Sequence, residues 1–138
     1  MVLLHKLSAP LLRAIRKGKE TEVVKALIES SGGDTIEQRR EYVMNSDYRG
    51  WTALHVATLK NDVALMTVLV SFGADLNART KELSTPLCVA AYNGKVEAAQ
   101  WLLVQGADQF LTDEQGRTPR DIALLQRKAK VAALMALP

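Results

Sequence analysis

A unit of 33 residues repeats along this chain, and this self-similarity constrains the fold more than any other feature. The segment 52–75, TALHVATLKNDVALMTVLVSFGAD, aligns without a gap onto 85–108, TPLCVAAYNGKVEAAQWLLVQGAD. Shared residues include the pairs Thr52/Thr85, Leu54/Leu87, Val56/Val89, Ala57/Ala90, Leu69/Leu102, Gly73/Gly106, Ala74/Ala107 and Asp75/Asp108. A fixed period of this length predicts a stack of like units, each of which buries its apolar face against the next.

Two further copies flank this pair. One begins at Thr118, again 33 residues after Thr85, and repeats its Thr-Pro start. A weaker copy, APLLRAIRKGKETEVVKALIE, covers residues 9–29, and about ten extra residues separate it from the next copy. The length of 138 residues suits one domain with its own core. We therefore expect a single domain over 1–138, with repeats at about 9–29 (plus an insertion, 30–43), 44–78, 79–111 and 112–137.

The repeated pattern resembles the ankyrin repeat, which carries T-P-L-H-x-A-A-x-x-G and later L-L-x-x-G-A-D. The resemblance covers nearly the whole chain, from Ala9 to Leu137, with atypical first and last copies. It implies an all-α repeat fold, an ankyrin-repeat solenoid of helix-turn-helix units linked by β-hairpin-like finger loops.

The residues themselves also predict two short helices in each copy. The threonine that opens a copy can cap the first helix with its hydroxyl, and Pro86 suits the first helical turn. Gly94 stands where that helix needs a left-handed residue to end it, and Asn61 takes the same place one copy earlier. The second helix carries an apolar stripe at helical spacing, formed in one copy by Leu65, Val68, Leu69 and Phe72.

Three residues depart from the repeated pattern. Arg127 stands where the last copy should have glycine or asparagine, so we expect a looser turn there. In the second finger, Thr80 and Leu83 replace the aspartate and glycine that are usual in the family. Either this finger is distorted or Leu83 is a contact residue.

The insertion and the C-terminal segment are also unusual. Residues 30–33 read as a flexible turn, after which Asp34 or Thr35 could cap one or two helical turns. The insertion is either a tolerated loop or a specificity element beside the first finger. Residues 131–137 predict an almost wholly apolar final helix, although a terminal repeat needs a polar outer face. We therefore expect that face to be covered, by self-association, by further repeats or by another partner.

Residues for catalysis are not arranged in any recognisable pattern. In the family, the residue at His55 bonds to neighbouring backbone and holds adjacent copies in register. Cys88 takes that position one copy later, which implies packing, and no base stands at a matching position to activate the thiol. Carboxylates occur singly, and there is no phosphate-binding loop. We expect no enzyme, no catalytic residue, no cofactor and no metal site.

Composition narrows the partners and the compartment. The single cysteine favours a reducing compartment, the cytoplasm or the nucleus. No stretch approaches the length of a membrane span, so we expect no membrane partner. The 18 basic and 15 acidic residues are spread over both halves of the chain, which makes nucleic acid an unlikely partner despite a pI of about 9.1.

The resemblance also implies a binding surface, formed by the finger tips and the exposed side of the first helices. The matching residues are Tyr48, Arg49, Trp51, Leu59, Lys60, Lys81, Glu82, Ser84, Tyr92, Asn93, Glu114, Gln115 and Arg117. Three of the seven aromatic residues fall in this set, and aromatic residues often dominate interface energy. We expect Trp51 to be the anchor, unless it folds down onto its own finger. Trp101 is expected to pack against a neighbouring second helix instead.

The leading interpretation is a protein-interaction module, an adaptor or a regulatory subunit that binds another protein. One alternative is a reader of a modified peptide or a small ligand, with Trp51, Tyr48 and Glu82 as part of an aromatic cage. Another is weak binding of nucleic acid.

Overall fold

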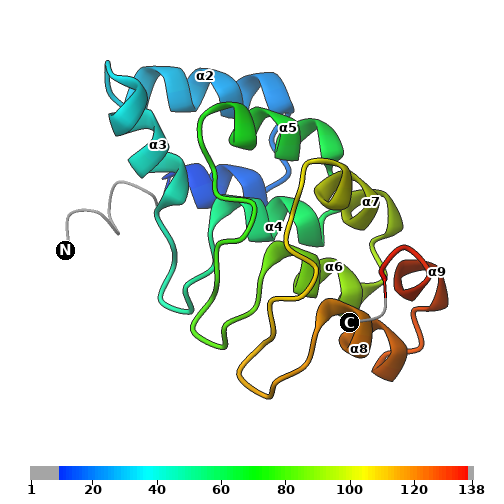
Figure 1. The fold of residues 1–138 in the computed structure, drawn as a ribbon. Helices are drawn as coiled ribbons and strands as arrows, with labels where there is room; N and C mark the ends of the chain where they lie inside the picture. Colours follow the sequence, from blue (N-terminus) through cyan, green and yellow to red (C-terminus); the bar gives the residue numbers. More distant parts are fainter. Residues whose placement is uncertain (1–9, 137–138) are drawn as a thin grey trace.

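Paired helices stack side by side in the computed structural model, which describes residues 10–136 (Figure 1). Residues 10–16 are helical, and the later helices are α2 (Thr21–Ser31), α3 (Ile36–Met44), α4 (Ala53–Leu59), α5 (Val63–Ser71), α6 (Pro86–Asn93), α7 (Val96–Val104), α8 (Pro119–Leu125) and α9 (Ala129–Ala132). The helix over 10–16 forms an inner layer with α4, α6 and α8, while α2, α5, α7 and α9 form an outer layer. The predicted all-α repeat solenoid is confirmed.

Equivalent threonines open the inner helices α4, α6 and α8. Thr52, Thr85 and Thr118 all have extended backbone. The hydroxyls of Thr85 and Thr118 accept hydrogen bonds of 3.2 Å from the amides three residues later. The 33-residue period therefore places equivalent helices in register.

The turn between paired helices is the same in all four copies. The amide after the turn residue donates to the carbonyl five residues before it, in the pairs Lys19–Ala14, Asp62–Ala57, Lys95–Ala90 and Lys128–Ala123. Arg127 has φ of 58°, close to 57° at Asn61 and 68° at Gly94. The expectation of a looser turn at Arg127 is wrong, because packing of α8 against α9 holds this residue in the left-handed region despite a cost of about 1–2 kcal/mol.

Three finger loops, over residues 45–52, 72–85 and 105–118, project from one side of the stack (Figure 1). Leu83 has φ of 61°, in the same left-handed region as Gly50 and Gly116 in the other fingers. The Thr80 amide donates to the Ser84 carbonyl at 3.0 Å, a bond that Asp47 and Asp113 make in their own fingers. The second finger is therefore not distorted, and Leu83, 41% exposed, remains a predicted contact residue.

The insertion is a packed helix rather than a loop. Helix α2 continues through Ser31, so the expected flexible turn shrinks to the few residues before α3. The Thr35 hydroxyl accepts from the Gln38 amide at 3.1 Å and caps α3, which is longer than the one or two turns expected. Tyr42 and Val43 are buried in the core. The insertion thus extends the core next to α2.

The last repeat ends in a shorter helix than expected. Helix α9 covers only Ala129–Ala132, and the buried side chains of Val131, Ala132 and Met135 join the core. The predicted helix is therefore confirmed at Val131 and Ala132 and wrong for residues 133–136, where the chain turns and Met135 packs into the core. Leu137 and Ala9 lie outside the described residues. Among residues 10–136, the helices are all too short or too polar to cross a membrane.

Candidate functional site

His55 joins the second repeat to the next finger. The Thr52 amide donates to His55 Nδ1 at 3.1 Å, so the ring proton lies on Nε2, which donates to the Ser84 carbonyl at 2.9 Å. The ring is fully buried, and burial lowers the pKa of His55 below its ordinary value of 6.5. His55 thus has the structural role that the resemblance implied.

Backbone hydrogen bonds hold the fingers against each other. The Lys81 amide donates to the Arg49 carbonyl, and the Glu114 amide donates to the Glu82 carbonyl, both at 3.0 Å. The side chain of Arg79 also donates to the Thr112 carbonyl. These contacts repeat from finger to finger, so the finger tips form one continuous edge.

Aspartates fix the first and third fingers. Asp47 accepts hydrogen bonds from the amides of Arg49 and Trp51, and Asp113 accepts from those of Gln115 and Arg117. Burial raises the pKa of each carboxyl group, but these amides and the nearby arginine outweigh burial and leave each pKa below 3.8. Both carboxylates therefore form hydrogen bonds that stabilise their own fingers.

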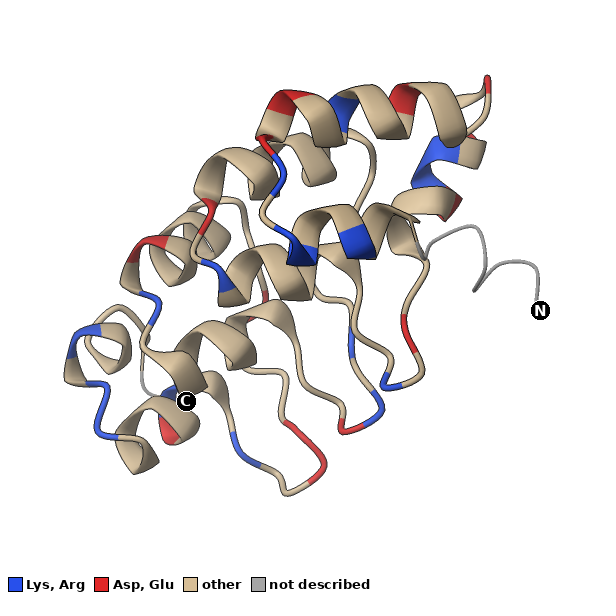
Figure 2. Cartoon of the chain, turned by 180° about the vertical axis from the view of Figure 1, so that it is seen from behind, with Lys and Arg blue, Asp and Glu red and all other residues tan. Residues whose placement is uncertain are grey.

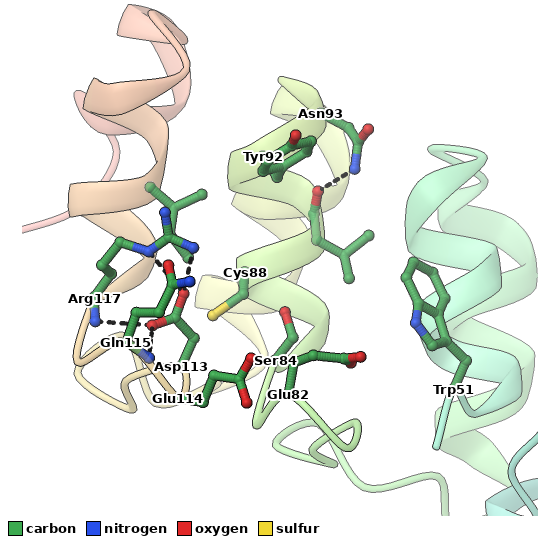
Figure 3. A pocket seen from close by; sticks show the side chains of 12 residues that line it. Trp51, Glu82, Ser84, Cys88, Tyr92, Asn93, Asp113, Glu114, Gln115 and Arg117 are labelled. Carbon is green, nitrogen blue, oxygen red and sulfur yellow. Dashed lines mark hydrogen bonds and ion pairs between the residues drawn. The ribbon is translucent and has the colours of Figure 1, made fainter. Parts of the chain in front are cut away.

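Between the fingers and the inner helices lies a groove of about 300 Å³ (Figure 3). Trp51 and Tyr92 form its aromatic sides, and Glu82 and Glu114 reach it from the second and third fingers. Its twelve lining residues are Trp51, Glu82, Ser84, Cys88, Val89, Tyr92, Asn93, Asp113, Glu114, Gln115, Arg117 and Ile122. Eight of them belong to the thirteen residues that the sequence predicted for partner binding.

The other five predicted residues lie outside this groove, toward the first finger. Tyr48 is 76% exposed at the first finger tip, and Lys81 is exposed on the second. Leu59 and Lys60 are exposed at the end of α4, where the Lys60 ammonium donates to the Arg16 carbonyl at 3.3 Å. The fifth, Arg49, lies over two aromatic rings of its own finger.

Trp51 is not the free loop-tip side chain that the sequence analysis expected. It is half-buried and packs against the core, with its ring centroid 5.7 Å from that of His55. The guanidinium carbon of Arg49 lies 5.2 Å from the Trp51 ring centroid and 5.8 Å from that of Tyr48. The alternative interpretation, in which Trp51 folds down onto its own finger, describes its position better. Trp101 is also partly buried against the core.

Sequence reasoning missed four groove residues, Cys88, Val89, Asp113 and Ile122. Val89 precedes Tyr92 by three residues on α6, so both lie on one helical face, and this spacing could have revealed Val89. Cys88 is 1% exposed and its sulfur accepts from the Thr85 hydroxyl at 3.3 Å. Within residues 10–136, no three histidine, cysteine or acidic side chains are grouped as metal ligands would be.

Comparison with known families identifies this architecture. A family model described as ankyrin repeats (3 copies) matches residues 4–80, more than half of the chain, and one described as ankyrin repeats (many copies) matches residues 69–123. The chain belongs to the ankyrin-repeat family, whose repeats typically bind proteins.

Several curated proteins share this repeat region. The chain is 42% identical over 80 residues to mouse inactive serine/threonine-protein kinase TEX14, a match that covers 58% of this chain and 6% of that protein. It is 32% identical over 90 residues to human protein phosphatase 1 regulatory subunit 27, a match that covers 65% of this chain and 58% of that protein. It is 30% identical over 103 residues to human transient receptor potential cation channel subfamily A member 1, a match that covers 72% of this chain and 9% of that protein. The matched region is thus less than two thirds of each relative's own length.

Proposed function

We propose that this chain is a protein-interaction module, an adaptor or a regulatory subunit, which holds a partner protein on its finger tips and inner helices. The groove beside α6 carries the proposal, because it gathers most of the predicted contact residues in one concave site. The stacked helices and joined fingers present this surface with little conformational freedom to lose. A rigid surface of this kind reduces the entropy cost of binding.

The relatives suggest a first partner to test. One of them, human protein phosphatase 1 regulatory subunit 27, is named as a subunit of a phosphatase. Protein phosphatase 1 is therefore the first candidate partner under this proposal. The similarity to an inactive kinase and to a channel shows that the same repeat region occurs in proteins of different kinds.

The arrangement of the reactive side chains supports binding rather than catalysis. Both ring nitrogens of His55 are engaged in hydrogen bonds, and the Cys88 thiol is buried beneath the groove. A reduced Cys88 is consistent with the proposal that the protein works in the cytoplasm or the nucleus.

The alternative functions have less support. A cage made by Tyr48 and Trp51 already holds a cation of the chain's own, the Arg49 guanidinium. Nucleic acid would meet Glu82 and Glu114 in the groove, which is unfavourable for a polyanion.

The test is a quantitative capture experiment on the wild type and on Tyr48→Ser with Tyr92→Ser. Both tyrosines are exposed, at 76% and 53%, so their loss should leave the fold intact, as circular dichroism would check. We expect purified protein phosphatase 1, or the partners found in lysate by mass spectrometry, to bind at least about tenfold more weakly, because exposed tyrosines are frequent hot spots.

The matched control removes two apolar side chains that are at least as exposed as the tyrosines but lie on other surfaces, Ile36→Ser on α3 with Val104→Ser on α7. This variant should retain its partners. If the tyrosine variant kept every partner that the control keeps, the proposed binding surface would be wrong.

A further inference from the structure

Basic and acidic side chains are unevenly distributed over the binding surface. Figure 2 shows basic residues along the inner helix over 10–16, and both basic and acidic residues on the fingers. Lys17 and Lys60 are exposed at the N-terminal end, where Arg16 pairs with Asp47 at 2.6 Å. The groove, toward the C-terminal end, carries Glu82 and Glu114. The N-terminal end of the surface is therefore basic, whereas the groove holds two exposed carboxylates beside the Asp113–Arg117 pair.

The two groove glutamates are available to a partner, whereas Asp113 is not. The Arg117 side chain holds Asp113 Oδ2 through Nε at 2.9 Å and through its terminal nitrogen at 2.8 Å. Within residues 10–136, neither Glu82 nor Glu114 forms an ion pair with a lysine or arginine. Both are exposed, and the one side-chain hydrogen bond that either carboxylate accepts in this part of the chain comes from the Thr80 hydroxyl, which lies 3.1 Å from Glu82 Oε2. The groove thus presents two carboxylates that no basic side chain of the described residues holds in an ion pair.

Apolar and aromatic surface lies beside these carboxylates. Trp51 and Tyr92 stand on the helix side of the groove, while the glutamates come from the finger side (Figure 3). Val89 and Ile122 add aliphatic surface. A lysine or arginine side chain has a long apolar stem and a charged head, and both cations bind favourably to aromatic faces. The groove matches both parts of such a side chain.

We propose that the groove takes an arginine or lysine side chain of the partner protein, with its charge against Glu82 and Glu114 and its stem against Trp51 and Tyr92. This inference rests on the proposed function and adds the chemistry of the partner. Acidic residues of the same partner segment then lie toward Lys17 and Lys60. Charge complementarity at both ends fixes the direction in which the segment crosses the repeats.

The test is selection of peptides from a random dodecapeptide display library on immobilised protein. We expect the wild type to enrich peptides that contain arginine or lysine beside apolar residues. Glu82→Gln with Glu114→Gln should bind these peptides about tenfold more weakly, and added salt should weaken wild-type binding. Glu82→Lys with Glu114→Lys should enrich acidic peptides instead.

The control, Glu29→Gln with Glu37→Gln, removes the same charge from exposed positions on α2 and α3, outside the groove. It should select the same peptides as the wild type. If the selected peptides lack basic residues but lose binding when Tyr92 is replaced by serine, this inference is wrong and the proposed function stands. If no enriched peptide loses binding with Tyr92→Ser, both this inference and the proposed function are contradicted.

Discussion

The Nε2 atom of His55 lies 2.9 Å from the carbonyl oxygen of Ser84, and this bond ties one repeat to the finger that opens the next. The Thr52 amide occupies the other ring nitrogen, at 3.1 Å. The imidazole must be neutral to make both bonds, because a protonated ring offers no acceptor to the amide. The position of the second finger therefore depends on the protonation state of a buried histidine.

We predict that the domain loses stability as the pH falls below 6.5. Burial holds the pKa of His55 below this value in the folded state, whereas the unfolded chain binds the proton near 6.5. The contribution of His55 is thus complete above 6.5 and is lost as the pH falls from there toward the folded pKa. Urea unfolding midpoints measured across this window would show the loss.

His55→Gln separates this effect from other titrations. The variant should be less stable than the wild type above pH 6.5, but its midpoint should change little with pH in the same window. Asp47 and Asp113 have pKa values below 3.8, so the stability that they contribute is lost only at lower pH. An equal pH slope in wild type and variant would exclude His55 as the cause.

Leu83→Gly should stabilise the domain by up to about 1 kcal/mol. Leu83 has φ of 61°, a conformation that costs a residue with a side chain about 1–2 kcal/mol, and glycine regains part of this despite its greater freedom in the unfolded chain. Chemical denaturation gives the difference. Leu83→Ala keeps the strained backbone and should bring no gain, so equal stability of the two variants would contradict this explanation.

Gly50→Ala should destabilise the domain more than Gly116→Ala does. Both glycines have positive φ, 79° and 75°, so alanine costs about 1 kcal/mol at either position. A Cβ atom at Gly50 would also lie 2.9 Å from the Lys81 amide nitrogen, whereas nothing lies within 4 Å of one at Gly116. Equal losses in thermal or chemical denaturation would mean that the first two fingers are not in tight contact.

The sequence was informative where structure is determined locally. The threonine caps and the glycine and asparagine turns follow from residues within one repeat, the 33-residue period follows from aligning the copies, and the structure bears each of them out. Arg127 and Leu83 were not expected in the left-handed region, because hydrogen bonds around each turn, such as those from Lys128 to the Ala123 carbonyl and from Thr80 to the Ser84 carbonyl, outweigh their own preferences. The identity of the single residue does not reveal these bonds.

The candidate site shows the same limit. The positions of the contact residues followed from the repeat pattern, and eight of them, six on the fingers and two on α6, line the groove. The half-burial of Trp51 did not follow, because it depends on the stacking of Arg49 and on the His55 ring. Ile122 enters the groove from the repeat after Tyr92, so its role appears only when two repeats are placed side by side.

Cys88→His should stabilise the domain by about 1–2 kcal/mol. Positions 55, 88 and 121 are equivalent, and in the outer two the side chain accepts from the amide of the capping threonine, at 3.1 Å for His55 and 3.0 Å for Asp121. A histidine at 88 could accept from the Thr85 amide and donate to the Arg117 carbonyl, which corresponds to Ser84 one repeat later. Each such bond contributes about 1 kcal/mol.

Denaturation above pH 6.5, with Cys88→Ala as the control for losing the sulfur, measures this gain. The new imidazole would also have to be neutral, so the gain in stability should shrink as the pH falls below 6.5. The same direction is expected for His55, whose pKa burial lowers. Cys88 lies beneath the groove and is 1% exposed. If the histidine variant is no more stable than the alanine variant, this space cannot hold an imidazole in the orientation that His55 adopts.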